Sequence, residues 1–569
     1  MNSIFRPIPL ISILILMLIV GLHFSYLFRF ALNVPNGDDY YCIYDFLIQY
    51  QAADSISEKL LLIITPWLEH TIAYTKILAL VNHLIFGVLD FKAYIFMGNL
   101  SLVGIFSLYY LLLSRMKKPI YFIIPIALLL FQPQSYEGLY WPAATAAYMS
   151  VIFFSFLSVY LACSDRRGAI WGALAAGTMA LYTFGSGVMV LPVVFVILLL
   201  KGDYRKLLIW SLWSAFILTL FLTFYVYPES SRPPIFQSLL TNPGYVFNYF
   251  FAFLGMTTDL EEANKMPNEV RHIIGYGFVL FVLLFGLLFK RFLAFLKNRT
   301  KNSADFWTIV GFSLIILGGT ASMALLRGQT EMIYIFSSRY KIYSANMTIL
   351  VFCAMLLFST KRPWEKYFLA LALTLSSVFF VVSYYHYTYK IKEQRDVFQA
   401  GVYNWNTNQQ WLLYRQTSYY EKTSEHFSRL MDRPESPYHI PSYFPTLARD
   451  RIEHAEMDSG LEVVSIDGKL VLFKNETAPQ AGIHRGNFIF FMSDKHIYLF
   501  PTLANANAKK NLIASGDWYK NGYVSLVNVD QLTPDTYRIG DYNSLTDHIR
   551  VFEEPIRIGA TYLPVFNKE

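Results

Sequence analysis

Two adjacent carboxylates are the first residues whose types and spacing could do chemistry. Asp38 and Asp39 follow Asn36-Gly37, shortly after the first long apolar segment of the chain. Neighbouring carboxylates at a membrane surface raise one another's pKa or share a cation. The pair could therefore act as a general base for an acceptor hydroxyl or bind a divalent metal ion. Asn, Gly and Asp are also turn formers, so a solvated turn is the alternative interpretation.

Charged groups continue in the same stretch of chain. Glu69 and His70 follow Trp67-Leu68, and a carboxylate beside an imidazole could bind a phosphate or orient a substrate. Lys76 lies six residues further on and could face a phosphate. A side chain that reaches to the membrane interface, or an ordinary lipid headgroup contact, is the alternative for His70 and Lys76.

Aromatic and basic residues recur in later polar stretches. Glu137 and Trp141 lie among tyrosines, which suits a carbohydrate platform, although aromatic belts are common in membrane proteins. Arg327, Arg339 and Lys341 fall in a stretch that we expect on the outer side of the membrane, where basic residues are disfavoured. We interpret these cations as contacts for an anionic lipid phosphate.

The elements that must position these residues are apolar. The chain is 55% hydrophobic and only 15% charged, with a mean hydropathy of +0.37, whereas soluble domains carry about 25% charged residues. Single soluble cores stop growing near ~250–300 residues, so lipid-facing segments explain the bias better. The apolar runs predict about eleven transmembrane helices, at 8–30, 93–114, 119–134, 146–163, 168–183, 185–200, 206–227, 272–290, 307–325, 343–360 and 366–385.

Basic residues support this count, because they cluster in every second connection: 115–118, 166–167, 201–206, 290–301 and 361–362. The positive-inside rule places these connections and the N-terminus in the cytoplasm, and an odd helix count places the C-terminal part on the opposite side. The run Ile8–Phe28 is long for a signal peptide and lacks a small-residue cleavage site, so we interpret it as a retained signal-anchor helix.

Charge and cysteine usage exclude several classes of protein. Residues 391–569 hold 19 basic and 22 acidic residues, which leaves 28 and 18 for residues 1–390. The basic excess thus lies in short connections of the membrane part, where it indicates topology and argues against nucleic-acid binding. Cys42, Cys163 and Cys353 form no C-x-x-C spacing, so we expect neither a disulfide framework nor a cysteine metal site.

Two domains follow from these patterns. Residues 1–390 form a polytopic membrane domain whose first outer loop, residues 31–92, is long and includes interfacial segments. Residues 391–569 form a soluble α+β or β-rich domain outside the cytoplasm, with a polar helical part at 391–432 and then short alternating runs. The predicted strands are 461–466, 470–473, 487–491, 497–500, 523–529 and 549–551.

This layout resembles that of GT-C-type membrane glycosyltransferases, in a bacterial subgroup. The resemblance covers about residues 1–390. It rests on one helix, a long outer loop that opens with Asp38-Asp39, interfacial helices, further spans and an outer C-terminal domain. Short patches add to it: Glu69-His70, Tyr136-Glu137 with Trp141, Phe184-Gly185-Ser186-Gly187 and Ser338-Arg339-Tyr340.

The resemblance implies a GT-C fold and an enzyme of the plasma membrane that uses polyprenyl-phosphate-linked sugars on the side away from the cytoplasm. It also implies that Asp39 or Asp38 is the catalytic base or a metal-site residue, and it leaves open whether a divalent cation takes part. Arg339 and Lys76 are our own assignments for the donor phosphate. The expected reaction transfers a sugar to a cell-envelope glycan or lipid.

Three other functions remain open. A flippase or transporter for a lipid-linked oligosaccharide should carry charged residues in mid-span, and the apolar segments have almost none. A glycan polymerase or ligase would favour a long outer loop late in the chain, and here the long loop comes first. A non-enzymatic envelope scaffold, whose C-terminal domain binds glycan or protein, could coexist with a transferase.

Overall fold

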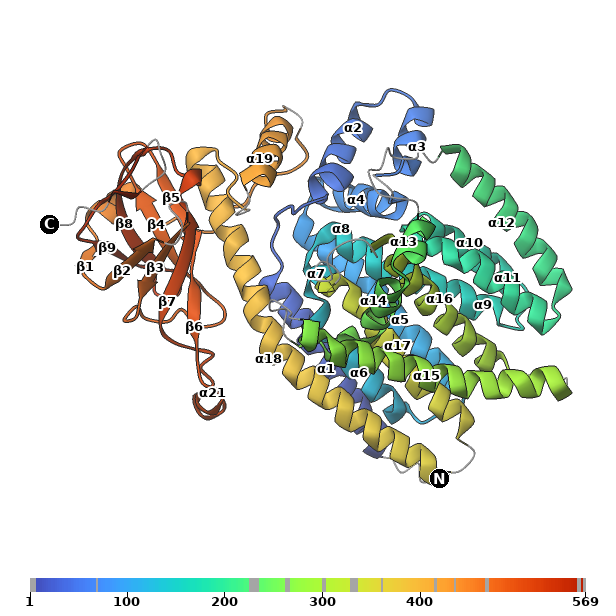
Figure 1. The fold of residues 1–569 in the computed structure, drawn as a ribbon. Helices are drawn as coiled ribbons and strands as arrows, with labels where there is room; N and C mark the ends of the chain where they lie inside the picture. The colour runs from blue at the N-terminus through green and yellow to red at the C-terminus, as the bar shows by residue number, and fades with distance from the viewer. Residues whose placement is uncertain are drawn as a thin grey trace, which may run out of the picture. The chain divides into compact units, whose positions relative to one another are not determined.

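The computed structural model describes residues 7–67, 70–224, 235–260, 267–298, 303–327, 336–359, 362–413, 417–433, 436–465, 470–559 and 564–565. The protein is mostly helical, with a β-sheet domain at its C-terminus (Figure 1). It divides into two compact units. The helical unit comprises Met1–Phe28 and Tyr41–Thr388, and the C-terminal unit comprises Arg29–Tyr40 and Tyr389–Glu569.

Eight helices in the described part of the chain are long and apolar enough to cross a membrane. Each coincides with one of the predicted spans. They are α1 (Pro7–Phe30), α5 (Phe91–Arg115), the continuous segment α8 (Pro142–Ala144), η4 (Thr145–Met149) and α9 (Ser150–Ala162), α12 (Tyr204–Phe224), α15 (Pro267–Asn298), α16 (Ala304–Arg327), α17 (Lys341–Phe358) and α18 (Arg362–Asn408).

The other three predicted spans correspond to shorter helices. They are η2 (Ile120–Ile123) with α6 (Ile124–Leu130), α10 (Ala169–Leu181), and η5 (Gly185–Met189) with α11 (Val190–Lys201). The first is shorter than predicted because Pro133 forces the preceding residue, Gln132, into an extended conformation. The chain then makes the short turns η3 (Pro133–Ser135) and α7 (Tyr136–Tyr140).

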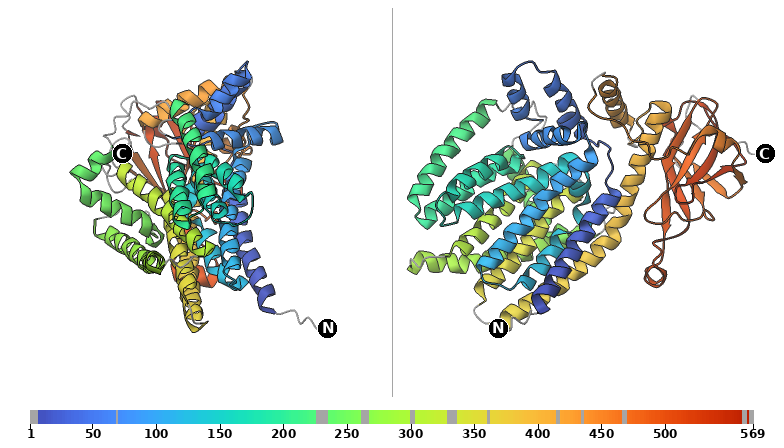
Figure 2. Two further views of the ribbon diagram at one scale, coloured as in Figure 1. Left: turned by 90° about the vertical axis from the view of Figure 1, so that its right-hand side faces the viewer. Right: turned by 180° about the vertical axis from the view of Figure 1, so that it is seen from behind.

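The segment after α1 is helical over most of its length. It contains η1 (Tyr40–Asp45), α2 (Phe46–Ala52), α3 (Ile56–Ile64) and α4 (Ala73–Phe86). The side chain of Ser55 caps α3 by accepting from the Glu58 amide, and α4 ends at Gly87, whose φ of 73° suits glycine. All views show α2, α3 and α4 at one end of the helical unit (Figures 1 and 2).

The predicted cytoplasmic connections meet one another within the helical unit. Arg115, at the end of α5, forms an ion pair with Asp305 at the start of α16. Lys118 pairs with Glu365 near the start of α18 at 2.7 Å. Lys206 donates to the Ser164 carbonyl at 2.7 Å, which joins the two connections on either side of α10 and α11.

The described part of the stretch between α12 and α15 folds into α13 (Ile235–Thr241), α14 (Pro243–Gly255) and η6 (Met256–Thr258). α14 crosses α15 at glycines. A Cβ atom on Gly255 would lie 1.9 Å from the Ile273 carbonyl oxygen, and one on Gly277 would lie 1.9 Å from the Phe251 carbonyl oxygen. The two backbones can approach this closely only because both residues lack a side chain.

The C-terminal unit contains two sheets. A seven-stranded sheet has the order β1-β9-β8-β10-β11, with β4 pairing β8 and β5 pairing β4, and a four-stranded sheet has the order β2-β3-β7-β6. All described pairings are antiparallel except that of β1 with β9. The strands are β1 (Glu456–Asp458), β2 (Leu461–Ser465), β3 (Leu470–Asn475), β4 (Asn487–Met492), β5 (Ile497–Pro501), β6 (Leu503–Ala506), β7 (Tyr519–Asn528), β8 (Asp535–Asn543), β9 (His548–Phe552), β10 (Ile556–Ile558) and β11 (Pro564–Val565). Three helices accompany them: α19 (Thr417–Met431), α20 (Arg449–Glu453) and α21 (Lys509–Ser515).

Both faces of the central strand β4 are buried. Ile489 and Phe491 point into a core shared with strands of the smaller sheet. Phe488 and Phe490 point to the opposite face, where the end of α18 packs through Tyr403. Since successive side chains of a strand alternate between faces, this double covering explains why Asn487–Met492 is apolar without alternation.

The six predicted strands correspond to β2, β3, β4, β5, β7 and β9, and the polar helical stretch corresponds to the end of α18 and to α19. Strands β1, β6, β8, β10 and β11 were not predicted. In β8 the apolar and polar residues do not alternate in sequence, because Gly540, Asp541 and Asn543 occupy buried positions. Pairing with three neighbours, β4, β9 and β10, defines that strand instead.

Candidate functional site

Four of the residues singled out in the sequence lie in one contiguous cluster of the helical unit. We define the Arg339 cluster as His70, Glu137, Trp141, Tyr148, Phe184, Arg339 and Tyr340. These residues come from the turn before α4, from α7 and its C-terminal end, from η4, from the turn before η5, and from η8 (Ser338–Tyr340), which leads into α17. Each contacts at least one other member.

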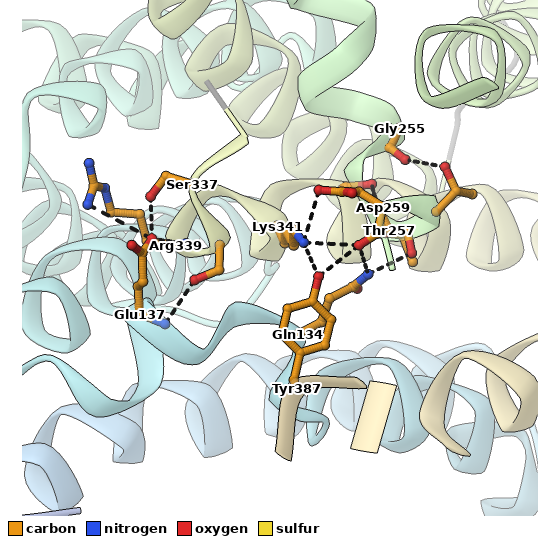
Figure 3. Close-up of polar contacts among 12 residues, drawn as sticks. Gln134, Glu137, Gly255, Thr257, Asp259, Ser337, Arg339, Lys341 and Tyr387 are labelled. Atoms are coloured by element: carbon orange, nitrogen blue, oxygen red, sulfur yellow. Dashed lines mark hydrogen bonds and ion pairs between the residues drawn. The ribbon is translucent and has the colours of Figure 1, made fainter. Parts of the chain in front are cut away.

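Glu137 holds η8 in place. Its backbone amide donates to the Ser338 hydroxyl at 2.9 Å, and its Oε2 accepts from the Ser337 hydroxyl and from the Arg339 amide at 3.4 Å. Figure 3 shows these contacts between α7 and η8. A carboxylate that accepts from the first amides of a helical turn also complements the dipole of that turn. Glu137 therefore orients the backbone that carries Arg339.

The Arg339 guanidinium lies among aromatic faces. It sits 5.4 Å from the centre of the Trp141 ring and 5.3 Å from that of Tyr340, both within cation–π range. Its Nη1 is 4.0 Å from Glu137 Oε2, which is too long for a direct hydrogen bond. The side chain is 21% exposed. The cation is thus held by the protein without being neutralised at close range.

Two donors of this cluster have no acceptor. Among the residues that the structure describes, neither Arg339 Nε nor Trp141 Nε1 has a hydrogen-bond partner, and both atoms are buried. An unsatisfied buried donor costs about 1–3 kcal/mol. Two such N–H groups, beside a guanidinium side chain that is 21% exposed, form a place where an acceptor with several oxygens would be stabilised.

Aromatic contacts extend the cluster to His70. Tyr340 meets Tyr148 edge to face at 5.4 Å, and Tyr148 packs on Phe184 at 4.8 Å. Phe184 stacks on the His70 ring at 4.5 Å and 24°. Such aromatic pairs stabilise by about 0.5–1.5 kcal/mol beyond their buried area, and they fix ring positions.

The turns that carry His70 and Phe184 are fastened together. Trp67 and His70 exchange two backbone hydrogen bonds of 2.9 Å, and the Thr71 hydroxyl donates to the Leu181 carbonyl at 2.8 Å. Gly187 is required where η5 folds back on α10, because a Cβ atom there would lie 1.8 Å from the Ala180 carbonyl oxygen. Gly187 thus permits the close backbone approach at this turn.

Asp38 and Asp39 belong to the C-terminal unit, whereas the Arg339 cluster belongs to the helical unit. That these carboxylates meet the cluster therefore stays a prediction. Asp39 is fully buried, and its Oδ2 accepts from the Asn36 amide at 2.8 Å. Its own amide donates to the Asn36 carbonyl at 3.0 Å, so Asp39 closes the turn at Gly37, whose φ is 54°. The Asp38 side chain is exposed. Of the two carboxylates, Asp38 is the one that a substrate could reach.

Lys76 makes contacts other than those expected of a phosphate ligand. It is buried, and its Nζ donates to the carbonyls of Leu62 and Thr65 at 2.7 Å each, at the C-terminal end of α3. Nζ also lies 5.2 Å from the centre of the Phe46 ring. Burial lowers the pKa of Lys76 to about 8. Two of the three Nζ donors thus satisfy orphan carbonyls of a helix end, and the assignment of Lys76 to the donor phosphate stays a prediction. Glu69 lies outside the described residues.

A second polar group lies beside the Arg339 cluster, two residues further along the chain. Lys341 and Asp259 form a fully buried ion pair, with Nζ 3.1 Å from Oδ2. Lys341 also donates to the Asp259 carbonyl at 3.0 Å and to the Tyr387 hydroxyl, and Gln134 donates to the Thr257 carbonyl at 2.8 Å (Figure 3). This group ties η6, α17, α18 and the turn before α7 together, so its role is structural.

The described residues contain no group of three or more His, Cys, Asp or Glu side chains that could hold a metal ion. The chemistry of the cluster is that of an anion site with aromatic walls. A cation, two N–H donors and flat rings suit a phosphate with an adjoining sugar or lipid. No protein-family model matches the sequence, and neither a curated protein nor a solved structure matches the chain.

Sequence reasoning missed Tyr148 and Ser337, and it named Ser338 only as part of the patch Ser338-Arg339-Tyr340. Tyr148 lies inside an apolar segment, where a tyrosine gives no signal of its own. Its position in the π-helical turn η4 is a signal only in the structure, since such turns are frequent at functional sites. The serines act through Glu137, which lies 200 residues away in sequence.

Proposed function

We propose that this protein is a GT-C-type membrane glycosyltransferase that moves a sugar from a polyprenyl-phosphate donor to a hydroxyl of a cell-envelope glycan or lipid. One observation carries the proposal. The guanidinium of Arg339 stands between aromatic rings, and both its Nε and Trp141 Nε1 lack an acceptor among the described residues. A phosphate group would accept from these donors and balance the charge.

In this proposal Arg339 and Trp141 bind the donor phosphate. The guanidinium stays charged at any physiological pH and offers several N–H groups in a planar fork, which suits phosphate oxygens. Glu137 positions this fork through the Arg339 amide rather than by touching the substrate. The faces of Trp141 and Tyr340 would exclude water from one side of the phosphate, which strengthens the charge-assisted hydrogen bonds.

The reaction balances as a single displacement at the anomeric carbon. The acceptor hydroxyl oxygen forms a bond to the anomeric carbon. At the same time, the bond between the anomeric carbon and the phosphate oxygen breaks. The polyprenyl phosphate leaves with the electron pair, and Arg339 stabilises the charge that develops on it. The acceptor proton passes to a carboxylate, which the sequence assigns to Asp38 or Asp39, and the exposure of Asp38 favours Asp38.

The topology that we propose has eleven crossings, with α6, α10 and α11 as the short ones, and with the N-terminus in the cytoplasm. The contacts of Arg115, Lys118 and Lys206 support it, because they join connections that the charge pattern assigns to the same side. α6 must cross if the ends of α5 and α9 are both cytoplasmic. The Arg339 cluster would then lie on the outer side, where lipid-linked sugars are used.

The test is the binding of a short polyprenyl phosphate to the full-length protein in nanodiscs. We expect Arg339→Gln to weaken binding at least about tenfold, since a hydrogen bond to a charged group contributes about 1.5–3 kcal/mol. Trp141→Phe keeps the ring and loses the N–H, so it should weaken binding less. Lys117→Gln removes an exposed cation from another connection of the unit and should change nothing.

Sugar transfer from a polyprenyl-phosphate sugar is then measured for Asp38→Asn and Asp39→Asn. We expect the Asp38 variant to lose most of its activity while it still binds the donor. Unchanged lipid binding in the Arg339 variant would refute the phosphate site. A wild-type protein that moves the donor across vesicles without transferring the sugar would be a flippase instead.

A further inference from the structure

The C-terminal unit contains a pocket, lined mainly by polar and charged residues, that the proposed transferase chemistry does not use. Its volume is about 320 Å³, and its walls include Asn487 of β4, Asp541 and Asn543 of β8, and His548 and Arg550 of β9. Binding pockets span about 300–1,000 Å³, so this pocket has the size for one small ligand or one unit of a larger one.

The pocket continues the inner face of the seven-stranded sheet. Ile489, Ile539 and Phe552 point into the hydrophobic core between the sheets. Side chains two residues further along a strand lie on the same face, and in these strands they are Asn487, Asp541 and Arg550. The register places Asn487 opposite Asn543, and Asn543 opposite His548. Next to the hydrophobic core, the same face of the sheet therefore carries a row of polar side chains on three adjacent strands.

The charges in the wall compensate one another. Arg550 Nε donates to Asp541 Oδ1 at 2.9 Å, and its Nη1 is 2.7 Å from Asp458 Oδ2. Tyr523 of the smaller sheet donates to Asp541 Oδ2 at 3.0 Å. Two carboxylates thus surround one guanidinium, which leaves no cationic surplus there for a phosphate or carboxylate ligand. The same contacts hold the wall rigid.

Asn487 supplies an acceptor that the protein leaves open. Its side chain is only 5% exposed, its Nδ2 donates to the Pro479 carbonyl at 2.9 Å, and its Oδ1 has no partner among the described residues. The neighbouring amide of Asn543 is satisfied, because its Oδ1 accepts from the amides of Leu545 and Thr546. A buried carbonyl oxygen of this kind calls for an O–H or N–H donor from outside the protein.

We propose that this pocket binds a neutral, polyhydroxylated ligand, which means one sugar unit of a glycan. Hydroxyl groups both donate and accept, so one sugar can donate to Asn487 Oδ1 while it contacts the carboxylates and His548 at the rim. An anionic ligand would meet two carboxylates and only one, already paired, guanidinium. This inference does not depend on the Arg339 cluster.

The experiment is ligand-observed NMR on the full-length protein with the methyl glycosides of glucose, galactose and N-acetylglucosamine, and with glucuronic acid as the anionic probe. We expect saturation transfer to at least one neutral glycoside and none to glucuronic acid. Asn487→Leu should raise the dissociation constant at least about tenfold, because it removes the open acceptor.

Thr546→Trp provides a second variant that does not disturb the buried network. Thr546 is exposed and lines the pocket, whereas its neighbour Leu545 is exposed without lining it. Thr546→Trp should abolish glycoside binding, and Leu545→Trp should leave it unchanged. Equal binding by both tryptophan variants, binding of glucuronic acid alone, or no binding of any neutral glycoside would overturn the proposal.

The two proposed sites can be tested independently of each other. Arg339→Gln should retain glycoside binding, and Thr546→Trp should retain polyprenyl-phosphate binding. A loss of both activities in either variant would contradict the independence of the pocket from the Arg339 cluster.

Discussion

Arg339 and Lys341 are two residues apart, yet they differ in burial and in how closely their charge is paired. Arg339 keeps a buried N–H that has no acceptor among the residues that the structure describes, and its side chain remains 21% exposed. Lys341 is fully buried and is neutralised by Asp259 at 3.1 Å. The sequence marks both as basic residues of an outer stretch, and only the contacts distinguish a cation that can meet a ligand from one that holds the fold together.

Breaking the Lys341–Asp259 pair should destabilise the protein strongly, whereas replacing both residues by apolar ones should change its stability little. Removing one partner leaves a buried charge, so we expect Lys341→Met and Asp259→Leu each to lower the free energy of unfolding by about 3–5 kcal/mol. The double variant Lys341→Met with Asp259→Leu should recover most of that loss. Thermal unfolding of the purified protein in detergent measures all three, and additive losses in the double variant would show that the pair is not coupled.

At the scale of elements, close helix crossing decides which residues are indispensable. α14 and α15 meet at Gly255 and Gly277, where added Cβ atoms would lie 1.9 Å from backbone oxygens of the partner helix. Gly275 lies on the same helix as Gly277, and a Cβ atom there would meet no atom of the described residues within 4 Å. Both residues are glycines of an apolar helix in the sequence, so the difference between them is tertiary.

Gly277 and Gly275 allow a prediction with a control on the same helix. Gly277→Ala should lower the melting temperature by several degrees, because the two helices must move apart. Gly275→Ala should leave it unchanged or raise it slightly, since alanine favours the helix by about 1 kcal/mol over glycine. Differential scanning fluorimetry in detergent compares the two variants directly, and similar melting temperatures would contradict the close crossing.

At the scale of the whole molecule, the eleven-crossing topology can be tested with engineered cysteines. The native Cys42, Cys163 and Cys353 are buried, so they can be replaced to give a background that does not react with maleimides. Exposed positions are available in connections of both predicted sides, namely Lys117 and Arg166 on the cytoplasmic side and Asp54 and Ile513 on the outer side.

We expect a membrane-impermeant maleimide to label Asp54→Cys and Ile513→Cys from outside intact cells. Lys117→Cys and Arg166→Cys should react only after the membrane is opened. Labelling of Arg166→Cys from outside, with Lys117→Cys still protected, would remove α6 from the set of crossings, because only one of the two segments between these positions would then span, and α6 is the shorter one.

The sequence by itself determined the helical and apolar character of the first part of the chain, the positions of its eight long helices and six strands of the C-terminal domain. These features follow from local composition and periodicity, which neighbouring residues fix without help from distant ones. It also identified His70, Glu137, Trp141 and Arg339 as residues worth attention.

Only the tertiary structure decided which of these residues meet and what each one does. Glu137 contacts Ser337 across 200 positions of sequence, and the polar row of Asn487, Asp541 and Arg550 becomes a pocket only when β4, β8 and β9 lie side by side. Lys76 donates to two carbonyls at the end of α3, a contact that its place in the sequence does not reveal. Hydrogen bonds and ring contacts between distant segments depend on how helices and strands pack, and the local pattern of residues does not encode that packing.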